Sequence, residues 1–161
     1  MQLTATPILT TGFLQTGALA GTLDAVAAST HFYLNTGKSP AFVWRYVASA
    51  LLGPAASTGG GGIIVTGIAM HYAIAFGWTL LFFLAASRFS ALRSNPWVIG
   101  PCYGLVVWLM MTRIIVPLTR IGPPKTFNAT QAAIGALILV ACIGIPIVFG
   151  AVRTLTSPRV A

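Results

Sequence analysis

The chain has 161 residues, of which 57% are hydrophobic and only 6% are charged. Ordinary soluble domains carry roughly 25% charged residues, so nine basic residues and one acid cannot coat a soluble fold of this length. The solvent for most of the surface is therefore lipid. The length predicts a single membrane domain over residues 1–161.

The net charge of +8 would suit a nucleic-acid-binding protein if the basic residues were clustered. They are instead scattered between and beside apolar runs, where they suit anionic lipid head groups and set topology. We therefore expect the lipid bilayer, and not nucleic acid, as the partner. A homo-oligomer or a larger membrane complex is left open.

Four runs satisfy the requirement of about 20 apolar residues for crossing a bilayer core. In chain order they cover residues 12–34, 62–87, 97–118 and 129–152. The first run is too long for the apolar part of a signal peptide, so it is taken as a membrane helix. Because lipid offers no hydrogen bonds to the backbone, each run is expected to be helical. The predicted fold is an all-α, four-helix transmembrane bundle.

A shorter helix is expected between the first two spans. A serine–proline start and a glycine–proline stop bound it at residues 40–52. About 12 residues of helix are too few to cross a bilayer, so this segment should lie along the interface or enter it as a re-entrant helix. Trp44, Arg45 and Tyr46 are predicted at the head-group level, which suits aromatic and basic side chains.

Local signals also mark the helix ends and their packing. Asn95 before a proline predicts a capped start of the third helix. Glycines at four-residue spacing, Gly17 with Gly21 and Gly100 with Gly104, favour close helix packing. Pro117 and Pro146 lie inside predicted spans and are read either as kinks that free backbone carbonyls or as tolerated packing features.

The orientation depends on a nearly balanced charge count. Four basic residues fall on each side, and only the α-amino group tips the balance toward both termini in the cytoplasm. The side of the termini has Arg88, Arg93, Arg153 and Arg159, and the opposite side has Lys38, Arg45, Arg120 and Lys125.

Ionisable groups inside the predicted spans are the main candidates for a site. Asp24 is the only acid of the chain, and an unpaired charge at a helix centre costs ~2.5–3.5 kcal/mol. At ~1.5 Å rise per residue, Asp24, His71, Arg113 and His31 all fall in the half of the membrane nearest the 40–52 helix. Tyr72 adds a further polar group next to His71. We hypothesise that Asp24 pairs with Arg113, His71 or both in the interior of the bundle.

Three interpretations of this polar cluster are kept. A buried ion pair can simply fix helix register. A proton or ion pathway could use His71, because histidine is the side-chain type suited to proton transfer at physiological pH. Ligand or pigment contact is the third, for which a visible absorption spectrum is the direct check.

The sequence offers no catalytic or metal-binding pattern. Haem ligation by His31 and His71 is disfavoured because their predicted depths differ by ~9 Å. Cys102 and Cys142 lack metal-type spacing and are interpreted as packing residues. There is no phosphate-binding glycine loop and no nucleophile elbow. We therefore expect no metal, no cofactor and no enzyme activity of the soluble type.

Several segments resemble a group of small four-span bacterial inner-membrane proteins, broadly YagU-like. They are Gly21-Thr22-Leu23-Asp24, the helix from Val47 to Pro54, Gly67 through His71, Asn95-Pro96 with Gly100-Pro101-x-Tyr103-Gly104, and Val116-Pro117-Leu118. The resemblance implies a bacterial inner membrane and no particular substrate. The expected function is a structural or accessory membrane protein, with a proton-linked channel or small-solute carrier as the alternative.

Overall fold

The computed structural model describes residues 10–123, 126 and 128–156, and this part of the chain contains helices and turns without a strand. The all-helical prediction is therefore confirmed. The elements are α1 (Thr11–Thr36), α2 (Ala41–Leu52), α3 (Gly61–Arg88), α4 (Pro96–Met110), α5 (Val116–Leu118), α6 (Ala129–Leu139) and α7 (Ile145–Thr156). Short 3₁₀ turns, η1 (Pro54–Thr58) and η2 (Ser90–Arg93), lead into and out of α3.

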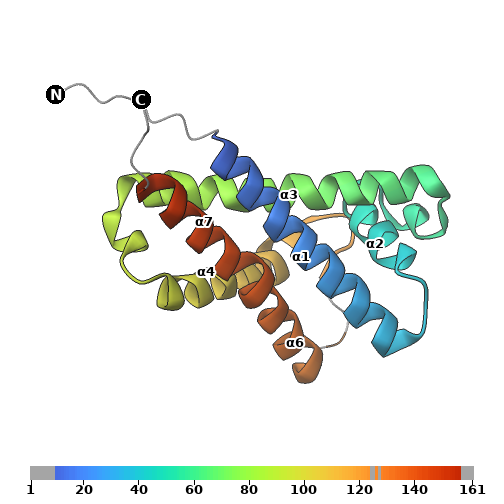
Figure 1. Ribbon diagram of the computed structural model, residues 1–161. Coiled ribbons are helices and arrows are strands. Elements are labelled where there is room, and N and C mark those ends of the chain that lie inside the picture. The colour runs from blue at the N-terminus through green and yellow to red at the C-terminus, as the bar shows by residue number, and fades with distance from the viewer. Residues whose placement is uncertain (1–9, 124–125, 127, 157–161) are drawn as a thin grey trace.

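Two π-helical turns join the later helices into longer rods. The turn η3 (Met111–Ile115) connects α4 to α5, and η4 (Val140–Gly144) connects α6 to α7. In both views, α1 and the α6–α7 rod lie side by side, and in Figure 1 α3 runs across them. Gly12 near the start of α1 lies against Thr154 near the end of α7, so these two helices are antiparallel.

Among the described residues, three helical rods are long and apolar enough to cross a membrane: Gly61–Arg88, Pro96–Leu118 and Ala129–Thr156. Helix α1 has 26 residues but is less apolar, because Gln15, Asp24 and His31 interrupt it. Many large apolar side chains are exposed, with Leu118 82% and Leu34 77% accessible. Apolar exposure of this extent is expected of a surface that meets lipid.

Glycines allow the helices to approach at backbone distance. A Cβ on Gly104 would meet the backbone of Leu139 and Val140, and one on Gly144 would meet the backbone of Gly100 and Gly104. On the other side of the bundle, Gly17 lies under the ring of Phe76, and Gly21 lies under the ring of Tyr72. The four-residue glycine spacing thus places α4 against the α6–α7 rod and α1 against α3, as small residues do in membrane helices.

The short helix α2 also packs closely on α3 at a glycine. A Cβ on Gly67 of α3 would collide with the backbone carbonyl of Trp44. The end of α2 is also bonded to the turn after α5, because the backbone amide of Arg120 donates to the carbonyl of Ala50 over 3.2 Å. The helix ends at Gly53, whose φ of 84° lies in a region that favours glycine. Helix α2 is therefore packed on the bundle along its length.

Each π-helical turn precedes an internal proline. Pro117 and Pro146 have no amide hydrogen, so the carbonyl four residues earlier in each helix loses its usual partner. The helix widens just before these positions: the amide of Val116 bonds the carbonyl of Met111, and the amide of Ile145 bonds that of Val140. The predicted disturbance at the prolines takes this form, and η3 places Arg113 in its centre.

The capped helix start at Asn95 is confirmed, since its side-chain oxygen accepts from the amide of Trp97 over 3.2 Å. Trp97 itself is 70% exposed at the beginning of α4. Lys125 and Arg159, which entered the charge count for orientation, lie outside the described residues, so the structure adds nothing to that count at these positions.

Replacing Gly67 by alanine should destabilise the protein by about 1–3 kcal/mol, because the added methyl group meets backbone and the α2–α3 contact must open. The matched control is Gly77→Ala on the same helix, where an added Cβ has no neighbour within 4 Å. Unfolding of the purified protein by increasing fractions of sodium dodecyl sulfate in mixed micelles measures both. Equal midpoints for the two variants would show that this close approach is not needed.

Candidate functional site

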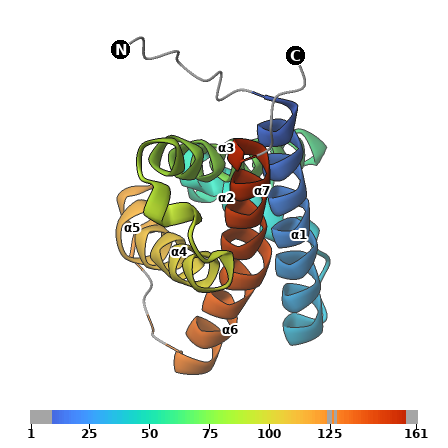
Figure 2. The same cartoon turned by 60° about the vertical axis from the view of Figure 1, so that its left-hand side comes forward.

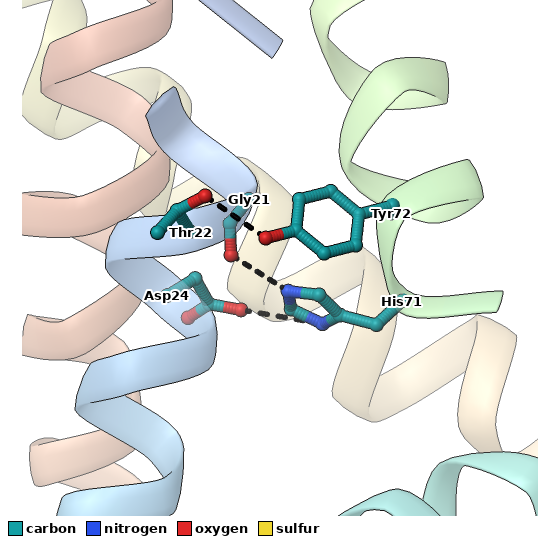
Figure 3. A network of polar contacts seen from close by, with 5 residues as sticks. All are labelled: Gly21, Thr22, Asp24, His71 and Tyr72. Carbon is teal, nitrogen blue, oxygen red and sulfur yellow. Dashed lines mark hydrogen bonds and ion pairs between the residues drawn. The ribbon is translucent and has the colours of Figure 1, made fainter. Parts of the chain in front are cut away.

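The only acid of the chain lies next to a histidine of the neighbouring helix. Asp24 on α1 places Oδ2 3.9 Å from Nδ1 of His71 on α3, and both side chains are largely buried, at 16% and 13% exposed. The other ring nitrogen, Nε2, is 2.9 Å from the carbonyl oxygen of Gly21. Figure 3 shows the imidazole directed at α1, with one nitrogen toward each group.

The hydrogen bond to Gly21 defines which ring nitrogen is protonated. A carbonyl oxygen only accepts, so Nε2 of His71 must carry the hydrogen. The opposite nitrogen, Nδ1, then faces the Asp24 carboxyl group. An imidazolium beside a carboxylate and a neutral imidazole beside a carboxylic acid are both neutral overall, and apolar surroundings favour either of them over an isolated carboxylate.

Neighbouring contacts keep the imidazole in place. Tyr72 and Thr22 join their hydroxyl groups across the same helix pair at 2.9 Å. The rings of Trp44 and Tyr72 meet the imidazole edge-on, with centroids 5.4 and 5.6 Å away. Trp44, which was predicted at the head-group level, therefore packs on the polar pair. Its position follows from the close contact between α2 and α3 at Gly67.

Asp24 also forms part of the wall of a large cavity of about 1490 Å³. The cavity lies between α1, α2, the α4–η3–α5 rod and α6, on the side of the bundle that holds α2. Its walls include His31, Arg45, Tyr46 and Arg113. The structure thus brings three members of the predicted cluster, Asp24, His31 and Arg113, to one space. The fourth member, His71, contacts Asp24 but does not line the cavity.

His31 lies on α1, as Asp24 does, and bonds to a side chain of α6. Its Nε2 is 2.8 Å from the amide oxygen of Gln131 on α6. Gln131 was not identified from the sequence, although the depth argument could have found it. It is the third residue of its helix, two residues or ~3 Å from the start of the fourth predicted span, which begins on the same side of the membrane as the end of the first span near His31.

The cationic side chains of the cavity come from separate elements. Arg113 extends from the π-helical turn η3, and Arg45 from α2. The guanidinium carbon of Arg45 is 5.5 Å from the ring centroid of Phe42. Its Nε is fully buried and makes no hydrogen bond. Of the predicted partners for Asp24, His71 lies 3.9 Å from its carboxylate, and Arg113 lines the same cavity.

The described residues contain no group of three histidine, cysteine or acidic side chains that could hold a metal ion. Cys142 lies in η4 and Cys102 in α4, both as free thiols. The two histidines bond to different helices, His31 to Gln131 and His71 to Gly21, and do not face a common centre. The arrangement can hold helices together, share a proton and accept a guest in the cavity.

Comparison of the chain with protein-family models, with curated proteins and with solved structures gave no match.

A double-mutant cycle of Asp24→Ala and His71→Ala should show a coupling free energy of between about 0.5 and 3 kcal/mol in favour of the wild-type pair. The reason is that either single substitution leaves a largely buried polar partner behind. Unfolding in mixed micelles again provides the free energies. The control cycle joins Asp24→Ala to Tyr103→Phe, whose hydroxyl bonds the carbonyl of Trp78, and its effects should add. A wild-type stability for Asp24→Ala would contradict the pairing.

Proposed function

We propose that this chain is a small integral membrane protein of structural or accessory type, in which the Asp24–His71 pair fixes α1 on α3. The observation that supports the proposal is the use of both ring nitrogens of His71. One nitrogen bonds the Gly21 carbonyl and the other faces Asp24, both on α1. A histidine engaged in this way links the two helices through one hydrogen bond and one charge contact.

The proposal includes a fourth span. Helix α1 is long enough to cross a bilayer, and its two ionisable groups, Asp24 and His31, face the cavity and not lipid. The contact of Asp24 with His71 reduces the main cost of placing α1 in lipid. Four spans put both termini on one side, which we assign to the cytoplasm of a bacterial inner membrane, as in the YagU-like proteins that the sequence resembles. We infer that α2 lies on the bundle at the interface, where Arg45 and Tyr46 reach the cavity.

A small-solute or proton-linked carrier is the second candidate, and the cavity favours it. A space of about 1490 Å³ with Asp24 in its wall could admit a solute, and π-helical turns such as η3 are frequent at functional sites. Transporters also place binding sites at interrupted helices. This function requires Asp24 and His71 to change partners during a cycle, whereas the structural function requires them to stay together.

Proteoliposomes that contain a pH-sensitive dye separate the two candidates. Under an imposed pH gradient, wild-type protein should give the same proton flux as protein-free liposomes, because the pair is a fixed contact. The comparison protein is Asp24→Asn, reconstituted at a matched folded fraction. Wild-type flux above that of empty liposomes, absent from Asp24→Asn, would replace the structural function by the carrier.

A further inference from the structure

The cavity combines apolar walls with an excess of positive charge. Lys38 in the turn after α1, Arg45 on α2 and Arg113 in η3 are the fixed cations of its lining. The only carboxylate in the lining is that of Asp24, which already has His71 as its neighbour. No other acidic side chain lines the described walls, so the lining carries more positive than negative charge. Positive charge held in this way in apolar surroundings is stabilised by a bound anion.

Arg45 gives the most specific sign of a missing partner. Its Nε is buried and has no hydrogen bond, although a guanidinium group offers five donors in a planar fork. The group is held over the ring of Phe42 at the cavity wall. A phosphate or carboxylate bound side-on accepts from Nε and from a terminal nitrogen together, which would satisfy the donor that the protein leaves unbonded.

The remaining walls indicate what is attached to that anion. Phe32, Val43, Trp108, Ile138 and Leu139 line the space between the helices. The volume of about 1490 Å³ exceeds the roughly 300–1,000 Å³ of ordinary small-molecule pockets. A free inorganic anion would fill a small part of it and leave the apolar walls unused. An alkyl chain fits the walls, and an anionic head group fits the cations.

We propose that this cavity binds an amphiphilic anion, an alkyl or acyl chain that ends in a phosphate or carboxylate group. The head group bonds Arg45, with Lys38 and Arg113 adding positive charge, and the chain lies against the aromatic and aliphatic walls. The site is separate from the helix-fixing contact of His71, so it does not depend on the structural function proposed above.

The test uses purified full-length protein in the neutral detergent dodecyl maltoside, with dodecyl phosphate as the probe and native mass spectrometry as the readout. One saturable equivalent should bind, and Arg45→Gln should weaken binding about tenfold or more, the effect of losing one charged hydrogen bond. Arg88→Gln, at the far end of α3, is the matched control and should bind as the wild type does. Equal affinities of the two variants would overturn the site.

Three further probes define the ligand. Dodecyltrimethylammonium has the same chain with a cationic head, and equal binding of it would overturn the proposal. Inorganic phosphate should compete weakly, and competition as strong as that of dodecyl phosphate would overturn the assignment of a chain. Phosphatidic acid distinguishes the two possible sources of the ligand. Displacement of dodecyl phosphate by phosphatidic acid indicates a bilayer lipid, and no displacement indicates a single-chain amphiphile.

If Arg45→Gln does not fold, preference of the wild type for dodecyl phosphate over dodecyltrimethylammonium supports the site, and equal binding overturns it.

Discussion

His71 joins α1 to α3 through both of its ring nitrogens, and much of the remaining structure depends on this contact. Nε2 donates to the carbonyl of Gly21, and Nδ1 lies 3.9 Å from Asp24. The glycine matters as much as the charged group, because a side chain at position 21 would meet the ring of Tyr72 and keep α3 away. The bond of Nε2 to the Gly21 carbonyl thus leaves Nδ1 as the ring nitrogen that faces Asp24.

The pair also explains how a helix with the chain's only carboxylate can belong to an otherwise apolar molecule. His71 gives Asp24 a neighbour that can carry the opposite charge. Once the acid is paired, the cations around the cavity become the larger electrostatic problem. Arg45 illustrates it, since the protein surrounds its Nε without giving it an acceptor. The fixed pair and the cationic cavity are therefore two consequences of having one acid among nine basic residues.

The helices could be predicted because their signals are local. Long apolar runs, the cap at Asn95 and the glycine stop at Gly53 each act within a few residues, and the structure ends its helices there. The meeting of Asp24 and His71 could be anticipated from depth alone, because helical rise converts residue number into position along the membrane normal. The same relation between residue number and depth places Gln131 within reach of His31.

Features that depend on contacts between distant segments could not be predicted from local signals or from depth. Nothing local to Trp44 shows that its carbonyl lies on Gly67, and so its edge-on contact with His71 was missed. Nor does the sequence show that prolines 117 and 146 are accommodated by π-helical turns. The cavity arises from four separate elements, and its volume depends on how their side chains leave space between them.

The central claim, that His71 is fixed between Gly21 and Asp24, is tested most directly by nitrogen NMR of protein labelled at histidine. The signals of His71 are assigned by their loss in His71→Gln. At constant pH, Asp24→Asn should shift the Nδ1 resonance of His71 and leave the resonances of His31, which bonds Gln131, unchanged. Identical His71 spectra in the wild type and in Asp24→Asn would contradict the account, because the acid would then not face that ring.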